Sequence, residues 1–153
     1  MSYERLLNQY QHIKIIEKVL PKGLSGFYYD NVIEINKFSN SYEKHCILAE
    51  ELGHHETTYG DITALDDLTS KKLELVARRW GYQKIVSLDN LIECYNTGHK
   101  TVEDICDHLE ITSSYLQDAI NVYNQKYGLF AIYNGYKIFF DPLNINKSFF
   151  DIK

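Results

Sequence analysis

The sequence lacks the cysteine pattern, the long apolar runs and the leader that mark secreted or membrane proteins. Its three cysteines, Cys46, Cys94 and Cys106, lie far apart without a C-x-x-C pair, so neither a disulfide framework nor a thiolate zinc site is indicated. No apolar run has the length needed to span a bilayer, and the first residues contain no signal-peptide hydrophobic region. We therefore expect a cytoplasmic protein whose thiols stay reduced.

Positively charged residues are outnumbered, with 16 Lys and Arg against 21 Asp and Glu. The formal net charge is −5, which gives no general attraction to nucleic acid or to anionic membranes but leaves room for a local basic patch. Aromatic side chains are abundant, with 13 Tyr and 7 Phe among 153 residues, and the hydrophobic content of 44% is ordinary for a globular protein. This composition argues against disorder, and the length fits one domain or one domain with a small appendage.

A small sheet is predicted near the start of the chain. Residues 3–11 indicate a short helix, and the alternation of apolar and polar residues over 13–19 predicts a strand. Residues 26–29 and 32–35 flank the pair Asp30-Asn31, which is typical of a hairpin with a two-residue turn. We therefore expect about three strands before the next helix.

Residues 46–55 combine apolar and charged side chains in an unusual way. The run Cys-Ile-Leu-Ala-Glu-Glu-Leu-Gly-His-His predicts a largely buried helix, in which an unpaired charge would be costly. Glu50 and His54 are four residues apart, so their side chains lie on the same helix face and can hold a metal. Glu51, about 100° further round the helix, would lie beside that metal.

A third carboxylate of interest lies on the next predicted helix, residues 70–86. Glu74 falls on the apolar face of that helix, close to Ala77 and Gly81. A charged residue among small residues on a packing face is unusual. We expect another helix to approach closely there and to provide a partner for Glu74.

These residues together suggest a hydrolytic metal site. A catalytic zinc takes three protein ligands and keeps a fourth position for water, and Glu50, His54 and Glu74 would supply the three ligands. The metal lowers the pKa of the water, and Glu51 can accept the proton of that water as it attacks a carbonyl. The same carboxyl group can later deliver the proton to a leaving amine.

The last third of the chain has a different pattern. Helices are predicted over residues 87–96, 101–109 and 113–126, followed by a hairpin over 130–140 with Asn134-Gly135 at its turn. This order is that of a winged helix-turn-helix. The helix over 113–126 has no Lys or Arg in its first turns to meet phosphates, so direct nucleic-acid binding is not expected and recognition of a protein partner is favoured.

The run from Ile47 to His55, followed by Glu74-x-x-Ala77-x-x-Trp80-Gly81, resembles the ImmA/IrrE family of metallopeptidases. The usual motif of that family is H-E-x-x-H with a third ligand in E-x-x-A-x-x-F-A, and the resemblance covers roughly residues 13–86. It implies a zincin-like core. Together with the pattern of elements, this predicts an α+β fold with the core over residues 1–86 and a winged-helix-like subdomain over 87–153. The resemblance also implies a cytosolic endopeptidase that cleaves helix-turn-helix repressors of phages and mobile elements.

Position 50 departs from the family motif, because Glu50 stands where a histidine is usual. By the resemblance, Glu51 matches the general base, while His54 and Glu74 match the second and third ligands. A site with one imidazole and two carboxylates should hold Zn²⁺ less tightly and accept Mn²⁺ or another hard cation better. We therefore keep a second hypothesis, a pseudo-peptidase that binds the repressor without cutting it and whose metal is structural or absent.

Several simpler interpretations stay open. A Glu-x-x-x-His pair is often just an exposed pair on a helix, and Glu51 with His55 would give a shifted register of the same motif. Tyr59 and Asp61 could support the site or only stabilise a loop. The remaining histidines His45, His99 and His108 are interpreted as ordinary polar positions.

Overall fold

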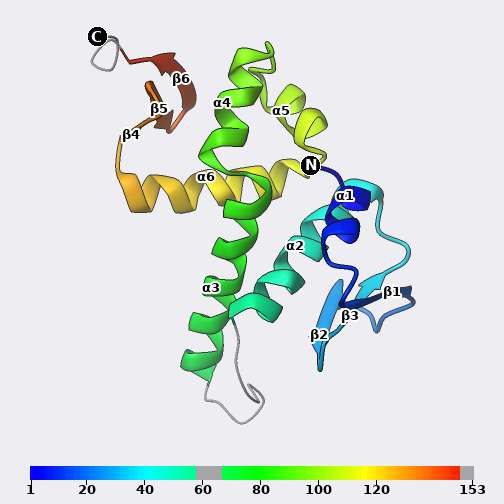
Figure 1. Ribbon diagram of the computed structural model, residues 1–153. Coiled ribbons are helices and arrows are strands. Elements are labelled where there is room, and N and C mark those ends of the chain that lie inside the picture. Colours follow the sequence, from blue (N-terminus) through cyan, green and yellow to red (C-terminus); the bar gives the residue numbers. More distant parts are fainter. Residues whose placement is uncertain (58–66, 149–153) are drawn as a thin grey trace.

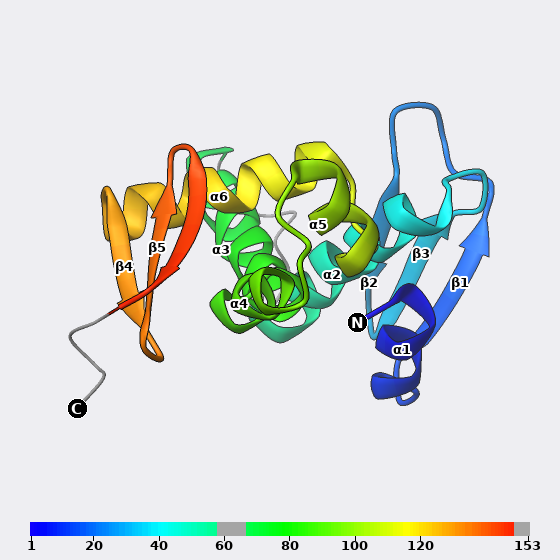
Figure 2. The same cartoon turned by 90° about the horizontal axis from the view of Figure 1, so that it is seen from above.

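The structure, a computed structural model, describes residues 1–57 and 67–148 (Figure 1). It is a mixed α+β architecture, which confirms the predicted fold class. The helices lie between two small sheets, one at each end of the molecule (Figure 2). In the described part of the chain, no helix combines the length and the apolarity needed to cross a bilayer.

The N-terminal sheet has the three strands that the sequence predicts. Its strand order is β1-β3-β2, with β1 parallel to β3 and β2 antiparallel to β3, so that β2 forms one edge. Asp30 and Asn31, at the β2–β3 turn, have φ values of 46° and 62°, as a type I′ hairpin turn requires. The elements are α1 (Tyr3–Gln9), β1 (Lys14–Lys18), β2 (Gly26–Tyr29) and β3 (Val32–Asn36).

Two long helices follow the sheet, α2 (Ser41–Thr57) and α3 (Asp67–Ile85). The start of α2 is fixed by a reciprocal cap, in which Asn40 Oδ1 accepts from the Glu43 amide at 2.9 Å and Glu43 Oε1 accepts from the Asn40 amide at 2.8 Å. The described part of α3 begins at Asp67, before the predicted start at residue 70. The side chain of His45 is fully buried in α2, and its Nδ1 lies 2.9 Å from the Glu110 carbonyl oxygen, so the interpretation of His45 as an ordinary polar position is wrong.

The C-terminal elements follow the predicted order, with one addition. The structure has α4 (Leu88–Asn96), α5 (Val102–Leu109), α6 (Ser113–Tyr127), β4 (Phe130–Tyr133), β5 (Tyr136–Phe140) and β6 (Leu143–Lys147). Strand β6 was not predicted, because its five residues contain only two apolar side chains and two asparagines, which are depleted in strands. It pairs with β5 to give an antiparallel sheet of order β4-β5-β6.

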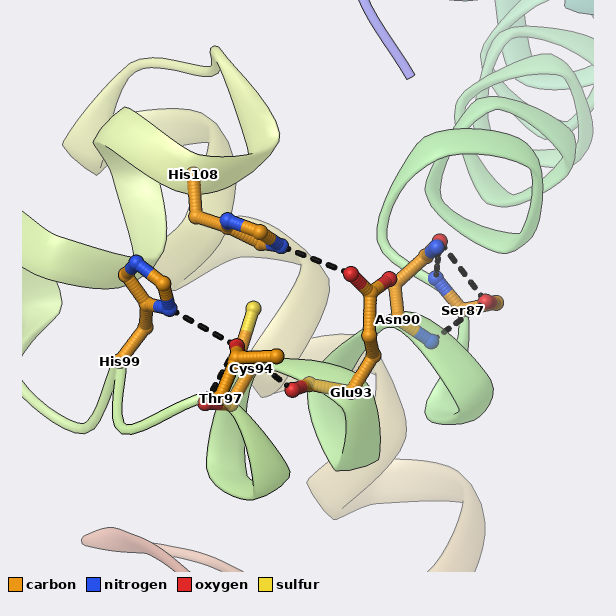
Figure 3. Close-up of polar contacts among 7 residues, drawn as sticks. All are labelled: Ser87, Asn90, Glu93, Cys94, Thr97, His99 and His108. Carbon is orange, nitrogen blue, oxygen red and sulfur yellow. Dashed lines mark hydrogen bonds and ion pairs between the residues drawn. The ribbon is translucent and has the colours of Figure 1, made fainter.

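Polar contacts fix the start of α4 and join it to α5 (Figure 3). Ser87 Oγ accepts from the Asn90 amide at 3.0 Å, and Asn90 Oδ1 accepts from the Ser87 amide at 2.9 Å. His108 Nε2 on α5 lies 2.9 Å from Glu93 Oε1 on α4, and the imidazole of His108 stacks on that of His99. These two histidines therefore hold the α4–α5 connection together, a role that their sequence context did not indicate.

One cluster of buried side chains runs through both halves of the chain, from Tyr3 to Ile145. Tyr123 on α6 connects the halves directly, because its buried hydroxyl donates to the Val86 carbonyl oxygen at 2.7 Å, just after α3. The helix α6 thus packs on the helix that carries Glu74. The division of the chain at residue 86 stays a prediction.

Tyr123→Phe should lower the free energy of unfolding by about 1–2 kcal/mol, because the Val86 carbonyl loses its buried donor. Urea denaturation measures this loss. The matched control is Tyr127→Phe, whose hydroxyl has no hydrogen-bond partner among the described residues and whose removal should change stability little. Equal effects of the two substitutions would contradict the prediction.

Candidate metal centre

The structure brings together the three residues that the sequence nominated as ligands. Glu50 and His54 lie one turn apart on α2, and Glu74 reaches them from α3, so that one ligand atom of each lies within 4.8 Å of the others. His54 Nε2 is 3.0 Å from Glu74 Oε2. The imidazole is mostly buried, with 11% of its side chain exposed, while the two carboxylates are 30% and 39% exposed. Solvent therefore reaches the cluster from the carboxylate side.

The helices α2 and α3 come close enough to bring these three side chains together because small residues lie where the helices cross. A Cβ atom built on Gly53 would lie 2.1 Å from the Ala77 carbonyl oxygen, and one built on Gly81 would lie 3.2 Å from the Ala49 carbonyl carbon and oxygen. Backbone packs directly on backbone at both contacts. This confirms the expected close approach of another helix to the small residues around Glu74.

Arg78 is a part of the site that the sequence interpretation missed. It follows Glu74 by one helical turn, and its Nε lies 3.1 Å from Glu50 Oε1 and 3.7 Å from Glu74 Oε1. The i,i+4 spacing of Glu74 and Arg78 was the available signal. The contact of Arg78 with Glu50 depends on how α3 crosses α2, and no local sequence pattern indicates it.

Burial and mutual contact shift the pKa values of the ligands in opposite directions. Burial raises the pKa of Glu50, with a further rise from the neighbouring Glu74. The hydrogen bond with His54 lowers the pKa of Glu74, and the same bond raises the pKa of His54. Glu74 is therefore the anionic partner of the imidazole in the absence of a cation.

Glu51 lies on the side of α2 that faces strand β2. A Cβ atom built on Gly26 in that strand would lie 3.2 Å from Glu51 Cγ and 2.5 Å from Ile47 Cγ2, so the strand passes very close to the helix. Burial raises the pKa of Glu51 to about 7. Near neutral pH this carboxyl group can therefore exist in either protonation state beside the cluster.

The shifted register, with His55 in place of His54, is not the one that the structure assembles. The His55 ring packs on Tyr28, and its Nδ1 lies 2.9 Å from the Tyr28 hydroxyl oxygen. His54 Nδ1 is buried and has no hydrogen-bond partner among residues 1–57 and 67–148. Tyr59 and Asp61, considered as supporting groups, lie outside the described residues.

The donor set fits a divalent cation. Two carboxylates and one imidazole can meet at a single point, which satisfies the three-ligand requirement of a catalytic zinc site and also suits harder cations such as Mn²⁺. The carboxylate side is open to solvent, as access of water to a bound cation would require. Which ion binds, and whether Glu50 ligates it, stay predictions.

Comparison with known proteins adds a family match. The family model described as the IrrE N-terminal-like domain, a peptidase family, matches residues 8–121. This range contains all four residues nominated for the site and extends into α6. No curated protein and no solved structure matches the chain.

Proposed function

Because the chain belongs to the peptidase family of IrrE N-terminal-like domains, we propose that it is a metal-dependent endopeptidase, with Zn²⁺ as the first candidate for its metal and Mn²⁺ as the second. Membership confirms the resemblance to the ImmA/IrrE family. The observation that carries the proposal is the cluster of Glu50, His54 and Glu74, whose ligand atoms lie within 4.8 Å of one another beside Glu51.

In this proposal each residue has one task. Glu50, His54 and Glu74 hold the cation, which supplies the Lewis acidity that lowers the pKa of water and polarises a peptide carbonyl. Glu51 takes the proton from the attacking water and passes it to the nitrogen of the leaving amine. Its position between α2 and β2 keeps it close to the cluster without making it one of the three ligands.

The free edge of the N-terminal sheet is the proposed track for the substrate. Strand β2 is at the end of the strand order, so one side of its backbone has no partner strand among the described residues. An extended peptide can pair with such an edge through main-chain hydrogen bonds. Because Gly26 of this strand packs next to Glu51, a peptide bond held there would lie near the proton carrier.

The proposed substrate is a helix-turn-helix repressor of a phage or mobile element, whose cleavage relieves repression. This part of the proposal rests on the resemblance to the ImmA/IrrE family, since the geometry of the site selects no particular substrate. We assign recognition of the repressor to residues 87–153. The first turns of α6 carry no Lys or Arg, so contact with a protein is favoured over contact with nucleic acid.

A second function, repressor binding without cleavage, is favoured by one observation. Arg78 contacts both Glu50 and Glu74, so the two carboxylates have a cationic partner without a metal. A protein that keeps the fold and this ion pair could regulate the repressor by binding alone. Incubation of the purified protein and repressor with Zn²⁺ or Mn²⁺ distinguishes the two, because an uncut but stably bound repressor supports only the second.

The wild-type protein should contain about one divalent cation per chain, and Glu50→Ala should retain much less, because only two protein ligands remain. Elemental analysis after purification without added chelator measures both. A suitable control is Glu56→Ala, which removes an exposed carboxylate from the last turns of α2 and should leave the metal content unchanged. A metal-free wild type after exposure to Zn²⁺ and Mn²⁺ would rule out the proposed site.

A further inference from the structure

We propose that Arg78 is a built-in counter-ion of the metal centre, which balances its excess negative charge and competes with the cation for the carboxylates. The inference rests on the proposed function in so far as it assumes that Glu50, His54 and Glu74 bind a cation. It concerns a residue outside that ligand set and predicts how tightly the cation is held.

The geometry places the guanidinium between the two acidic ligands. Its Nε is 3.1 Å from Glu50 Oε1, a hydrogen-bond distance, and 3.7 Å from Glu74 Oε1. Glu74 uses its other oxygen, Oε2, toward His54. Arg78 thus binds the carboxylates on the side away from the imidazole, where 52% of its own side chain stays exposed. The guanidinium can move outward when a cation arrives without any rearrangement of the helices.

The charges of the site explain why such a partner is needed. Glu50 and Glu74 bring two carboxylates to one small volume, because their ligand atoms lie within 4.8 Å of each other. Arg78 brings a permanent positive charge into contact with both carboxylates. Without a cation, the same guanidinium keeps the adjacent carboxylates of Glu50 and Glu74 from repelling each other.

The charge of Arg78 therefore has opposite effects on cation binding and on the stability of the metal-free protein. A guanidinium that contacts two ligand carboxylates repels an incoming cation and occupies lone pairs that the cation needs. Removing it should therefore strengthen cation binding while it weakens the metal-free protein. A residue that only supports the shape of the site would give the opposite result for the cation, because its loss would loosen the ligands.

The test compares Arg78→Gln with Arg79→Gln, its neighbour on α3. Arg79 is exposed and has no ion pair or hydrogen bond among the described residues, so it controls for the loss of one positive charge on the same helix. Competition with a chromogenic chelator gives the Kd for Zn²⁺ and for Mn²⁺. We expect Arg78→Gln to bind both cations roughly tenfold more tightly than the wild type, and Arg79→Gln to bind them as the wild type does.

Thermal unfolding in excess chelator provides a second measurement that needs no metal. Arg78→Gln should lower the midpoint by about 2 °C, because the carboxylates of Glu50 and Glu74 then face each other unscreened. In a Glu50→Gln background the repulsion is already gone, so Arg78→Gln should have a smaller effect on the midpoint.

Unchanged or weaker cation binding in Arg78→Gln overturns the proposal, even if the wild type is a working metalloprotein. Cation binding by Arg78→Gln but not by the wild type supports it strongly. If neither protein binds a cation, the proposed metal function and this inference fail together, whereas a metal-binding wild type that behaves like Arg78→Gln contradicts only the role of Arg78.

Discussion

Glu51→Gln should slow cleavage of the repressor by at least about 100-fold, because an amide cannot accept the proton of the attacking water or deliver one to the leaving amine. The substitution keeps the size and shape of the side chain beside Gly26, so the contact between α2 and β2 should persist. Cation content should also persist, since Glu51 is not one of the three ligands. A time course of repressor cleavage, followed by gel electrophoresis, measures the effect.

The matched control is Glu56→Gln, which removes an exposed carboxylate from the last turns of the same helix. It should cleave the repressor at the wild-type rate. Elemental analysis and circular dichroism of both variants establish that fold and metal loading are unchanged. If Glu51→Gln cut the repressor as fast as Glu56→Gln, proton transfer by Glu51 would have no part in the reaction.

Gly53→Ala should lower the free energy of unfolding by about 3 kcal/mol, which is near the upper end of the usual cost of overpacking. Replacing a helical glycine with alanine normally stabilises a helix by about 1 kcal/mol. A loss of stability in Gly53→Ala would therefore point to the contact between the helices. The reason is local: the added Cβ would lie 2.1 Å from the carbonyl oxygen of Ala77, and backbone cannot rotate away as a side chain can. The helices α2 and α3 must separate, which also moves Glu74 away from Glu50 and His54.

Gly81→Ala provides the comparison at the second crossing point. Its added Cβ would meet the Tyr115 hydroxyl at 2.8 Å, which is the end of a side chain, and the Ala49 backbone at 3.2 Å. A smaller loss of stability is therefore expected than at Gly53. Urea denaturation and cation titration of both variants measure the two consequences, and a Gly53→Ala protein as stable as Gly81→Ala would show that the crossing adjusts without cost.

The sequence was sufficient to predict that Glu50, His54 and Glu74 lie together, because the signals for this are local. Glu50 and His54 share a helix face by their spacing alone, and small residues around Glu74 indicated the close approach of another helix. The hairpin turn at Asp30-Asn31 was equally accessible, because few residues tolerate positive φ. In each case the type and spacing of neighbouring residues are enough to predict the local geometry.

Contacts that depend on tertiary structure could not be predicted from the sequence. Arg78 contacts Glu50 only because α3 crosses α2, and the buried imidazole of His45 has a partner only because the Glu110 carbonyl lies beside it. Strand β6 forms through its pairing with β5, against the low strand preference of its own asparagines. These features depend on residues distant in sequence, whose positions no periodic pattern encodes.

The backbone contacts of Gly53 with Ala77 and of Gly81 with Ala49 have a consequence for changes at the proposed metal site. They join the two helices through backbone atoms, in addition to the contacts made by the side chains that are proposed to touch the metal. The requirements of folding therefore fall on the glycines and alanines, while those of the proposed chemistry fall on Glu50, Glu51, His54 and Glu74. The scaffold should therefore tolerate exchange of a proposed ligand, such as Glu50, so that a catalytic and a non-catalytic protein can share one framework.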